Sequence, residues 1–248
     1  MFDIKLKDDL LVDTEGTSDG TQCKYYENGY WYKTDNEGAE GVVEYLVSKL
    51  LTFSDLPIDS YVLYEQGRIN GKRGCRSKTF FGKGEAFVTL ERMHQNVSGQ
   101  PLFESMKLRR MEDAIEYVLR FFEDIAHINL FEYFQRVFTL DYISLNEDRH
   151  FHNLGIIMDS KGGYRAAPIF DNGKSLLNAN PSINFKHSIE ENVKKVTARP
   201  FSGSHERMFH YFGAGFHLDI NGAISWLESE ADSFYKEVLF YQLTHTEL

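Results

Sequence analysis

One stretch decides the fold of this chain: Asn146-Glu-Asp148-Arg-His150-Phe-His-Asn153, followed after a short gap by Phe170-Asp171-Asn-Gly173. Transfer of a nucleotide γ-phosphoryl needs one carboxylate that accepts or orients the proton of the acceptor. It also needs oxygen ligands for the metal that neutralises the phosphates. Asp148 is the candidate base, and Asn153 and Asp171 are the candidate metal ligands. The spacing is therefore typical of a phosphotransferase.

The second carboxylate gives this motif most of its specificity, because an Asp followed five positions later by an Asn is a weak signal by itself. Segments 154–158 and 164–170 are predicted to be two short strands joined by the turn-forming residues 159–163. A hairpin of this kind brings Asn153 and Asp171 back to the same end. The alternative is that the aspartates are ordinary loop residues that cap turns.

Length and composition indicate a folded protein. The chain has 248 residues and a mass of 28.8 kDa, with 42% hydrophobic and 26% charged residues, as in ordinary soluble globular proteins. The formal net charge is −10 and the pI is near 5.4, without a dense run of Lys or Arg. Direct binding of nucleic acid is therefore not expected, because a basic surface is missing.

Cysteine usage and apolar runs bear on the compartment. Cys23 and Cys75 are the only cysteines and show no metal-ligand spacing, so free thiols in a reducing compartment are predicted. The N-terminus has no long apolar core, and no later run is long enough to cross a bilayer. We expect a cytoplasmic protein without membrane association, although export without a cleavable signal would leave the same sequence pattern.

The pattern of hydrophobic residues changes near residue 100. Short β-like segments alternate with Gly-rich turns before it, and helical periodicity dominates after it. We therefore predict an α+β, two-lobed fold, with a small β-rich N-lobe at residues 1–92 and a larger, mainly helical C-lobe at residues 93–248. Helices are expected at 105–127 and 131–138, and these two helices lead into the loop that carries Asp148.

Several features of the N-lobe suit nucleotide binding. Residues 15–24 are rich in Gly and small hydroxyl residues and end in Lys24, a composition whose backbone amides can hold phosphate. An Asn-Gly turn leads into an aromatic strand that ends at Lys33. The amphipathic helix predicted for residues 37–51 offers Glu40 and Glu44 to a buried lysine, as in the Lys-Glu pair of kinases. Each glutamate has the alternative of being a surface charge.

A connector between the lobes is predicted at residues 79–93. This segment looks like a β-hairpin that runs into a hinge, whose backbone amides and carbonyls read the adenine edge. Beyond Asp171 the sequence is less informative. Arg199 is expected to border the mouth of the site, Asp219 is a plausible N-cap of a helix, and His205 is expected to be a partly exposed structural residue.

With these features in chain order, the sequence resembles the HipA-like serine/threonine kinases from Gly16 to the C-terminal helices. The segment Gly20-Thr21-Gln22-Cys23-Lys24 is similar to the phosphate loop of that family, Gly-Ala-Gln-x-Lys. The segment Val88-Thr-Leu-Glu91-Arg92-Met93 is similar to its hinge. Asp148 to Asn153 resembles its catalytic loop, and Phe170 to Gly173 stands where the family places its metal-binding aspartate.

The resemblance implies an ATP- and Mg²⁺-dependent kinase that acts on a protein substrate. By it, Asp148 is the base, Asn153 and Asp171 hold Mg²⁺, Lys33 touches phosphate and His150 lies near the nucleotide. The remaining residues expected at the nucleotide are Gly20, Thr21, Gln22, Lys24, Glu40, Glu91, Arg92 and Met93.

Regulation and partners are also implied by the resemblance. Family members are silenced by phosphorylation of a hydroxyl in the phosphate loop, where this chain has Thr17 and Ser18, so autophosphorylation is expected there. Toxin-type members bind an antitoxin, and an antitoxin-like partner is the corresponding expectation. Because this sequence begins almost at the phosphate loop, we expect it to lack the N-terminal subdomain with which those members dock the antitoxin, so recognition of a DNA-bound antitoxin is not expected.

Two other functions stay open from the sequence. One is a lipid or small-molecule kinase, because phosphoinositide kinases also place Asp-Arg-His before their metal-binding Asn. The lack of Lys/Arg clusters argues mildly against this function, since an anionic membrane attracts basic surfaces. The other is a pseudokinase that binds nucleotide without catalysis.

Overall fold

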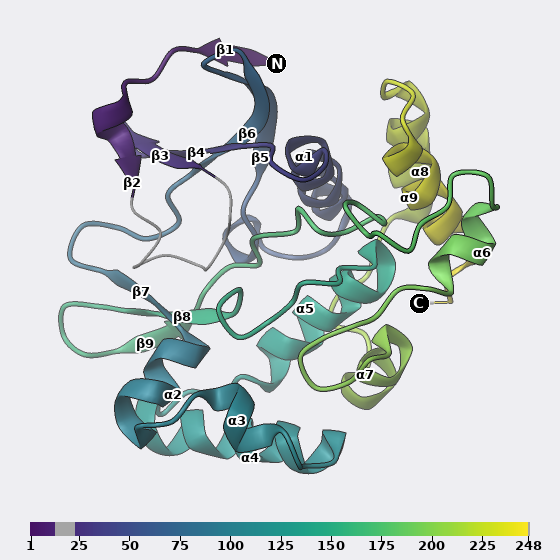
Figure 1. Ribbon diagram of the computed structural model, residues 1–248. Helices are drawn as coiled ribbons and strands as arrows, with labels where there is room; N and C mark the ends of the chain where they lie inside the picture. Colours follow the sequence, from purple (N-terminus) through teal and green to yellow (C-terminus); the bar gives the residue numbers. More distant parts are fainter. Residues whose placement is uncertain (13–22, 248) are drawn as a thin grey trace.

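The N-terminal part of the chain is built on a six-stranded sheet with the strand order β1-β5-β6-β4-β3-β2. The computed structural model describes residues 1–12 and 23–247, and Figure 1 shows this sheet at the upper left. All neighbouring strands are antiparallel except β1 and β5, which are parallel. The strands are β1 (Phe2–Ile4), β2 (Leu11–Val12), β3 (Lys24–Glu27), β4 (Tyr30–Thr34), β5 (Tyr64–Ile69) and β6 (Lys72–Lys78).

The β3–β4 hairpin places two lysines side by side. Its turn is Asn28-Gly29, with φ values of 50° and 81°, which is the left-handed backbone that this dipeptide favours in tight hairpins. The register set by this turn pairs Lys24 with Lys33. Both lysines are buried, at 4% and 8% relative exposure, so the turn predicted from the sequence also fixes where these two charges lie.

Helix α1 (Glu40–Leu50) packs against β5 and β6. One face of the helix is fully buried, including Val43, Val47 and Leu50, as the apolar spacing predicts. Its first turn lies directly on β6, because a Cβ on Gly41 would come within 2.5 Å of the Gly74 carbonyl carbon. This close approach sets the depth of α1 against the sheet.

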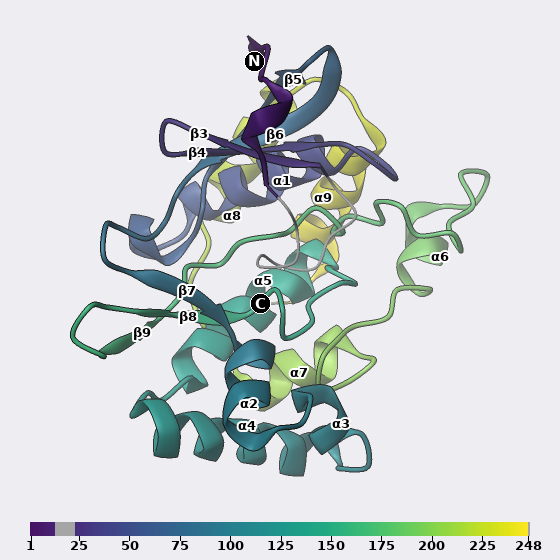
Figure 2. The same ribbon diagram turned by 60° about the vertical axis from the view of Figure 1, so that its left-hand side comes forward.

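A second, three-stranded sheet lies between the N-terminal sheet and helices α2–α4, as both views show (Figures 1 and 2). Its order is β7-β8-β9, with β7 (Ala86–Thr89), β8 (Gly155–Met158) and β9 (Tyr164–Ala166). The β8–β9 hairpin predicted beyond Asn153 is confirmed. The hairpin predicted over 79–93 is wrong, because β7 pairs with the distant β8 and not with a strand of its own segment.

The C-terminal part is mainly helical, and α5 runs through its centre (Figure 1). The long helix expected over 105–127 is two helices, because residues 107–110 interrupt it. The helices are α2 (Leu90–Ser98), α3 (Leu102–Met106), α4 (Met111–Ala126), α5 (Phe131–Ser144), α6 (Ile189–Val193), α7 (His205–Phe212), α8 (Ile220–Ser229) and α9 (Phe234–His245). Three single 3-10 turns are η1 (Asp8–Leu10), η3 (Leu51–Phe53) and η4 (Ile58–Ser60).

Helices α8 and α9 lie beside α1 in both views, so the end of the chain contacts the N-terminal part (Figures 1 and 2). The Trp226 ring stacks on Phe53 with centroids 5.5 Å apart. The Tyr45 hydroxyl on α1 donates to Glu230 over 2.7 Å. Asp219 caps α8 as predicted, since its carboxylate accepts from the Gly222 amide. These contacts fix α1 from the side opposite the sheet.

The structure confirms a mixed α+β chain with a β-rich N-terminal part and a helical C-terminal part. The lobe boundary between residues 92 and 93 stays a prediction, and that position lies inside α2. Among the described residues, no helix combines the length and apolar character needed to cross a membrane.

The aromatic core around α5 is expected to dominate stability. Phe138 is 1% exposed and contacts the rings of Phe134, Phe201 and Phe212, at 5.3–5.8 Å between centroids. Phe138→Ala should therefore lower the free energy of unfolding by about 3–5 kcal/mol, measured by urea denaturation. The control Phe103→Ala, at a ring that is 56% exposed, should change it by less than about 0.5 kcal/mol. Equal effects would contradict this assignment of the core.

Candidate active site

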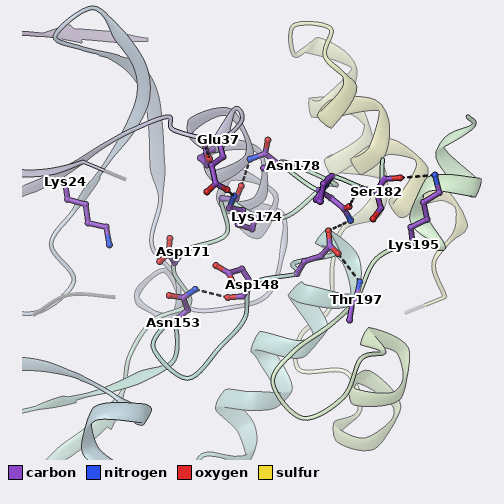
Figure 3. A pocket seen from close by; sticks show the side chains of 16 residues that line it. Lys24, Glu37, Asp148, Asn153, Asp171, Lys174, Asn178, Ser182, Lys195 and Thr197 are labelled. Carbon is purple, nitrogen blue, oxygen red and sulfur yellow. Dashed lines mark hydrogen bonds and ion pairs between the residues drawn. The ribbon is translucent and has the colours of Figure 1, made fainter. Parts of the chain in front are cut away.

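One cavity brings together the motif residues singled out from the sequence. Its volume is about 900 Å³, and it extends from the N-terminal sheet to the loop that follows α6 (Figure 3). Asp148, Asn153 and Asp171 line it, from two loops that meet at the end of the β8–β9 hairpin. The rest of the wall is formed by Lys24, Glu37, Glu40, Glu147, Gly173, Lys174, Asn178, Ala179, Asn180, Pro181, Ser182, Lys195 and Thr197.

The loop from Asp148 to Asn153 is held by its own hydrogen bonds. The Asn153 side-chain amide donates to the Asp148 carbonyl over 2.9 Å, and the Asp148 amide donates to the Asn146 side chain over 3.0 Å. The Asp148 carboxylate is 41% exposed, with His150 at 3.7 Å and Arg199 at 3.8 Å. Asp148 is therefore a fixed carboxylate that an incoming hydroxyl can reach.

Helix α7 holds the start of this loop through a hydrogen bond. His205 Nε2 lies 2.8 Å from the Asn146 carbonyl oxygen, so the ring donates to it. The ring is buried, at 7% exposure, and this burial lowers the His205 pKa although the bond to Asn146 opposes the change. The expectation of a partly exposed histidine is wrong for His205. Its position ties the catalytic loop to the helical core.

Asn153 and Asp171 present oxygen atoms suited to a divalent cation. Asn153 is 4% exposed, and its Oδ1 atom is buried without a hydrogen-bond partner among the described residues. Such a buried acceptor is costly unless something binds it. Asp171 lines the same cavity, and carboxylate and amide oxygens are the ligands that Mg²⁺ prefers. These two residues therefore fit the magnesium ion that the motif implies.

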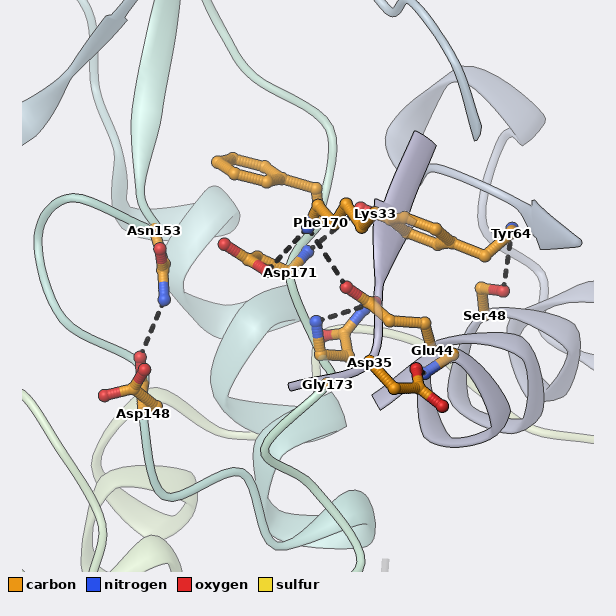
Figure 4. Close-up of polar contacts among 12 residues, drawn as sticks. Lys33, Asp35, Glu44, Ser48, Tyr64, Asp148, Asn153, Phe170, Asp171 and Gly173 are labelled. Atoms are coloured by element: carbon orange, nitrogen blue, oxygen red, sulfur yellow. Dashed lines mark hydrogen bonds and ion pairs between the residues drawn. The ribbon is translucent and has the colours of Figure 1, made fainter. Parts of the chain in front are cut away.

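Lys33 lies between two carboxylates (Figure 4). Its Nζ atom is 2.7 Å from Asp171 Oδ1 and 3.3 Å from Glu44 Oε1. The other oxygen of Glu44 accepts from the Asn172 amide over 2.8 Å. The Tyr64 hydroxyl accepts from the Asp171 amide over 3.3 Å. Strand β4, helix α1 and the Asp171 loop thus meet at one buried lysine.

The structure selects Glu44, and not Glu40, as the partner of Lys33. Glu40 accepts hydrogen bonds from the amides of Asn36, Glu37 and Gly38, at 3.0–3.3 Å. It thereby holds the backbone that leads into α1, at the edge of the cavity. Its assignment as the lysine-holding residue is corrected, because its carboxylate is used by these amides.

The charges at this site shift one another's pKa values. Burial disfavours the charged form of Lys33, but attraction to Asp171, Tyr64 and Glu44 outweighs burial and raises the Lys33 pKa well above its usual value. Burial likewise disfavours ionised Asp171, but Lys33 and Lys24 lower its pKa below the usual range. For Glu44, burial raises the pKa from 4.5 to about 6. At neutral pH all three groups are therefore charged.

Arg149 connects the two loops of the site. Its side chain is 1% exposed, and it binds both oxygens of the Asp141 carboxylate on α5, at 2.9–3.3 Å. It also donates to the Phe170 carbonyl and to Asn172 Oδ1, both over 2.7 Å. Because Phe170 and Asn172 flank Asp171, this guanidinium sets where the metal-ligand candidate lies.

A smaller, aromatic cavity of about 370 Å³ shares Lys24 with the larger one, and Lys33 lines the smaller cavity as well. Phe80, Phe87 and Phe170 form one wall, with ring centroids 5.3–5.4 Å apart. The remaining lining residues are Trp31, Tyr64, Ser77, Phe81, Glu85 and Ala86. An aromatic, mostly apolar cavity next to cations suits a planar base that carries phosphates.

One edge of β7 faces this cavity. The Leu90 amide donates to the Leu154 carbonyl over 2.9 Å, which fixes the alternation of the β7–β8 ladder. By that alternation, the amide and carbonyl of Phe87 point away from β8. In the part of the chain that the structure describes, no strand pairs with this edge. Phe87 therefore offers a backbone donor and acceptor beside the aromatic cavity.

Of the hinge predicted over residues 88–93, Glu91, Arg92 and Met93 are helical and not extended. These residues form the first turn of α2, where the Glu91 amide donates to the Phe151 carbonyl and the Arg92 amide donates to Thr89. Met93 is in the core. Their backbone groups are used within the protein, and the extended connector is β7 instead.

The structure describes only some of the other residues that were expected to contact the nucleotide. Gly20, Thr21 and Gln22, together with Thr17 and Ser18, lie outside the described residues. Lys24 is described and lines both cavities. His150 lies beside Asp148, and its role near a nucleotide stays a prediction.

The sequence interpretation missed three functional contributions: Tyr64, the Arg149–Asp141 pair and the Phe87 edge. Asp141 gave one signal, because it is a carboxylate in the predominantly apolar run of α5. Tyr64 and Phe87 gave none, since their roles depend on contacts with segments far away in the chain.

Comparisons with known proteins support the kinase fold. No family model and no curated protein matches the sequence. The crystal structure of a Helicobacter pylori proinflammatory kinase, CtkA, superposes with a TM-score of 0.66 at 17% sequence identity, covering 98% of this chain and 93% of that chain. This chain has a kinase fold.

A second solved structure aligns less closely. It is HipA of Shewanella oneidensis MR-1 in a complex with HipB and operator DNA, with a TM-score of 0.42 and 12% identity over 96% of this chain and 66% of that chain. The α+β kinase-like fold predicted from the sequence resemblance is confirmed by the CtkA superposition.

Removal of the Arg149 side-chain contacts should make the protein less stable. Arg149→Met leaves the Asp141 carboxylate buried and unpaired, which should lower the free energy of unfolding by about 3–5 kcal/mol in urea denaturation. Arg165→Met is the control, because Arg165 is 51% exposed and pairs with Glu85 at the surface. It should cost at most about 1 kcal/mol. Similar losses for the two variants would contradict the structural role of Arg149.

Glu44 should make nucleotide binding depend on pH. As the pH falls through about 6, Glu44 becomes protonated and Lys33 loses one of its two carboxylate partners. Wild-type affinity for Mg²⁺-ATP should fall about tenfold between pH 7.5 and 5.5 in calorimetric titrations. Glu44→Gln should bind weakly at both pH values. Glu65→Gln changes an exposed residue on β5 and serves as the control, so it should keep the wild-type pH dependence of affinity. If Glu44→Gln also kept this pH dependence, the role of Glu44 would be contradicted.

Proposed function

We propose that this chain is an ATP- and magnesium-dependent kinase that transfers the γ-phosphoryl of ATP to a Ser or Thr hydroxyl on a protein. The observation that carries the proposal is the unpartnered Asn153 Oδ1 atom, which shares a cavity with the Asp171 carboxylate and with the accessible Asp148. A metal-ligand pair beside a carboxylate base is the arrangement that phosphoryl transfer requires.

The nucleotide is proposed to span the two adjoining cavities. Its base would lie among Phe80, Phe87 and Phe170, with the Phe87 backbone reading the adenine edge. Its phosphates would lie toward Lys24 and Lys33, the two lysines paired across the β3–β4 hairpin. These cations supply the charge that holds phosphates in place, and their burial strengthens that attraction.

The remaining residues have separate roles in the proposed reaction. Asn153 and Asp171 would hold Mg²⁺, which when bound neutralises charge on the phosphates. Asp148 would accept the proton of the acceptor hydroxyl as that oxygen bonds to the γ-phosphorus of ATP. The bond between this phosphorus and the β,γ-bridging oxygen breaks, and ADP leaves. Glu44 keeps Lys33 in position. Asp148 is 41% exposed, which suits an acceptor that arrives from solvent.

A labelling experiment with three acceptor conditions tests this function. The purified chain is incubated with γ-labelled ATP and Mg²⁺ alone, with cell extract, and with anionic lipid vesicles. Label on protein is the expected result. Label on lipid only would favour a lipid kinase, and a Mg²⁺-dependent thermal shift with ATP but no label would favour a pseudokinase; either result would overturn the proposal.

Two variants separate the roles of the carboxylates. Asp171→Asn should abolish turnover because it weakens metal binding. Asp148→Ala should lower kcat by about 10²–10⁴-fold while ATP affinity stays within about twofold of wild type. Asp124→Asn, an exposed aspartate on α4, serves as the control with wild-type turnover. If both site variants kept wild-type rates, the assigned roles would be wrong.

The sequence resemblance supports two further proposals about regulation. Self-labelling is proposed at Thr17 or Ser18, and mass spectrometry of protein incubated with Mg²⁺-ATP identifies the modified residue. An antitoxin-like protein partner is proposed on the same basis. Co-purification of a second protein with the tagged Asp148→Ala chain would support this partner.

A further inference from the structure

A basic segment borders the outer end of the active-site cavity in an otherwise acidic protein. Residues 174–199 contain five lysines and arginines and two glutamates, whereas acidic residues exceed basic ones by ten in the whole chain. The segment follows the Asp171 loop and includes α6. It therefore places an excess of positive charge where an acceptor would approach.

Lys195 and Arg199 are two cations of this segment that lie at the site. Lys195 lines the same cavity as Asp148, and both are visible in Figure 3. The Arg199 guanidinium lies 3.8 Å from the Asp148 carboxylate and is 60% exposed. Residues that flank a hydroxyl at Asp148 would therefore lie near Arg199, and residues that extend along the cavity would meet Lys195. The basic residues Lys195 and Arg199 are called the basic rim below.

The basic rim keeps its charge available for a ligand. Lys195 Nζ bonds to the Ser182 carbonyl at 3.1 Å and to Asn192 Oδ1 at 3.0 Å, which are both neutral acceptors. Within the described residues, Arg199 has no carboxylate partner other than Asp148. By contrast, Lys174 and Lys194 of the same segment are each paired with a glutamate.

The nearby carboxylates are already bound. Glu147 accepts from the Asn180 side chain over 2.6 Å and from the Thr197 amide over 3.0 Å. Glu191 forms the capping box of α6 with Ser188. These hydrogen bonds fix where the two carboxylates lie, and the basic rim adds positive charge beside them.

We propose that the basic rim selects acceptor segments in which Asp or Glu residues flank the phosphorylated Ser or Thr. This inference rests on the proposed function and adds the chemical class of the substrate. An extended peptide advances about 3.3 Å per residue, so residues adjacent to the hydroxyl pass within reach of Lys195 and Arg199. Acidic flanks gain attraction there, and basic flanks are repelled.

Peptide binding tests the inference without depending on turnover. Two fluorescein-labelled peptides, each with one Ser, carry either Asp and Glu or Lys and Arg on both sides, and their Kd values are measured by anisotropy at low salt. Wild type should bind the acidic peptide at least about fivefold more tightly, and added salt should reduce this preference.

Variants identify which residues cause the preference for the acidic peptide. Lys195→Glu should remove most of this preference, and Lys195→Arg, which keeps the charge, should retain it. Lys161→Glu makes the same change of charge at the exposed β8–β9 turn and should leave the preference intact. If wild type shows no preference, or if Lys161→Glu and Lys195→Glu have equal effects, the inference is overturned.

Turnover of the same peptides distinguishes this inference from the proposed function. Asp171-dependent phosphorylation with equal kcat/KM for both peptides would contradict the rim's role in selecting the acceptor and leave the kinase function standing. Acidic-peptide binding without any phosphorylation would contradict the kinase function and leave the acid-binding rim standing.

Discussion

The active-site geometry depends on one buried guanidinium. Arg149 has lost its hydration, and its donors are matched by the Asp141 carboxylate, the Phe170 carbonyl and the Asn172 side chain, at 2.7–3.3 Å. Removal of either charge would leave the other buried and unpaired, which proteins tolerate poorly. The pair therefore connects helix α5 to both the loop from Asp148 to Asn153 and the backbone around Asp171.

A second constraint fixes the phosphate-side lysine. Helix α1 is held on one side by the close contact of Gly41 with Gly74 and on the other by α8 and α9. The close packing of α1 on the sheet places Glu44 beside Lys33, and the Asn172 amide donates to the remaining Glu44 oxygen. The two parts of the chain are thereby joined at the point where phosphates are proposed to bind, so the lysine and the metal-ligand candidates share one rigid frame.

Local sequence predicted that Asn153 and Asp171 lie at the same end of one hairpin, and both line one cavity. Whether they bind a metal stays a prediction. The Asn-Gly turn likewise predicted the strand that ends at Lys33. The choice between Glu40 and Glu44 was not predictable, since both lie on one helical face and the depth of α1 decides between them. The hinge was misplaced at 91–93, although Thr89 has the N-cap chemistry that starts a helix there. The Arg149 contacts required the tertiary fold.

We propose that Asn153 and Asp171 bind one divalent cation next to Asp148. Anomalous scattering from crystals grown with Mn²⁺ and a non-hydrolysable ATP analogue would locate this cation. We expect one strong anomalous peak between Asn153 Oδ1 and the Asp171 carboxylate, with the phosphates of the analogue on its other side. Nucleotide density with the metal peak elsewhere, and with Asn153 Oδ1 turned away from it, would show that these two residues do not bind the cation.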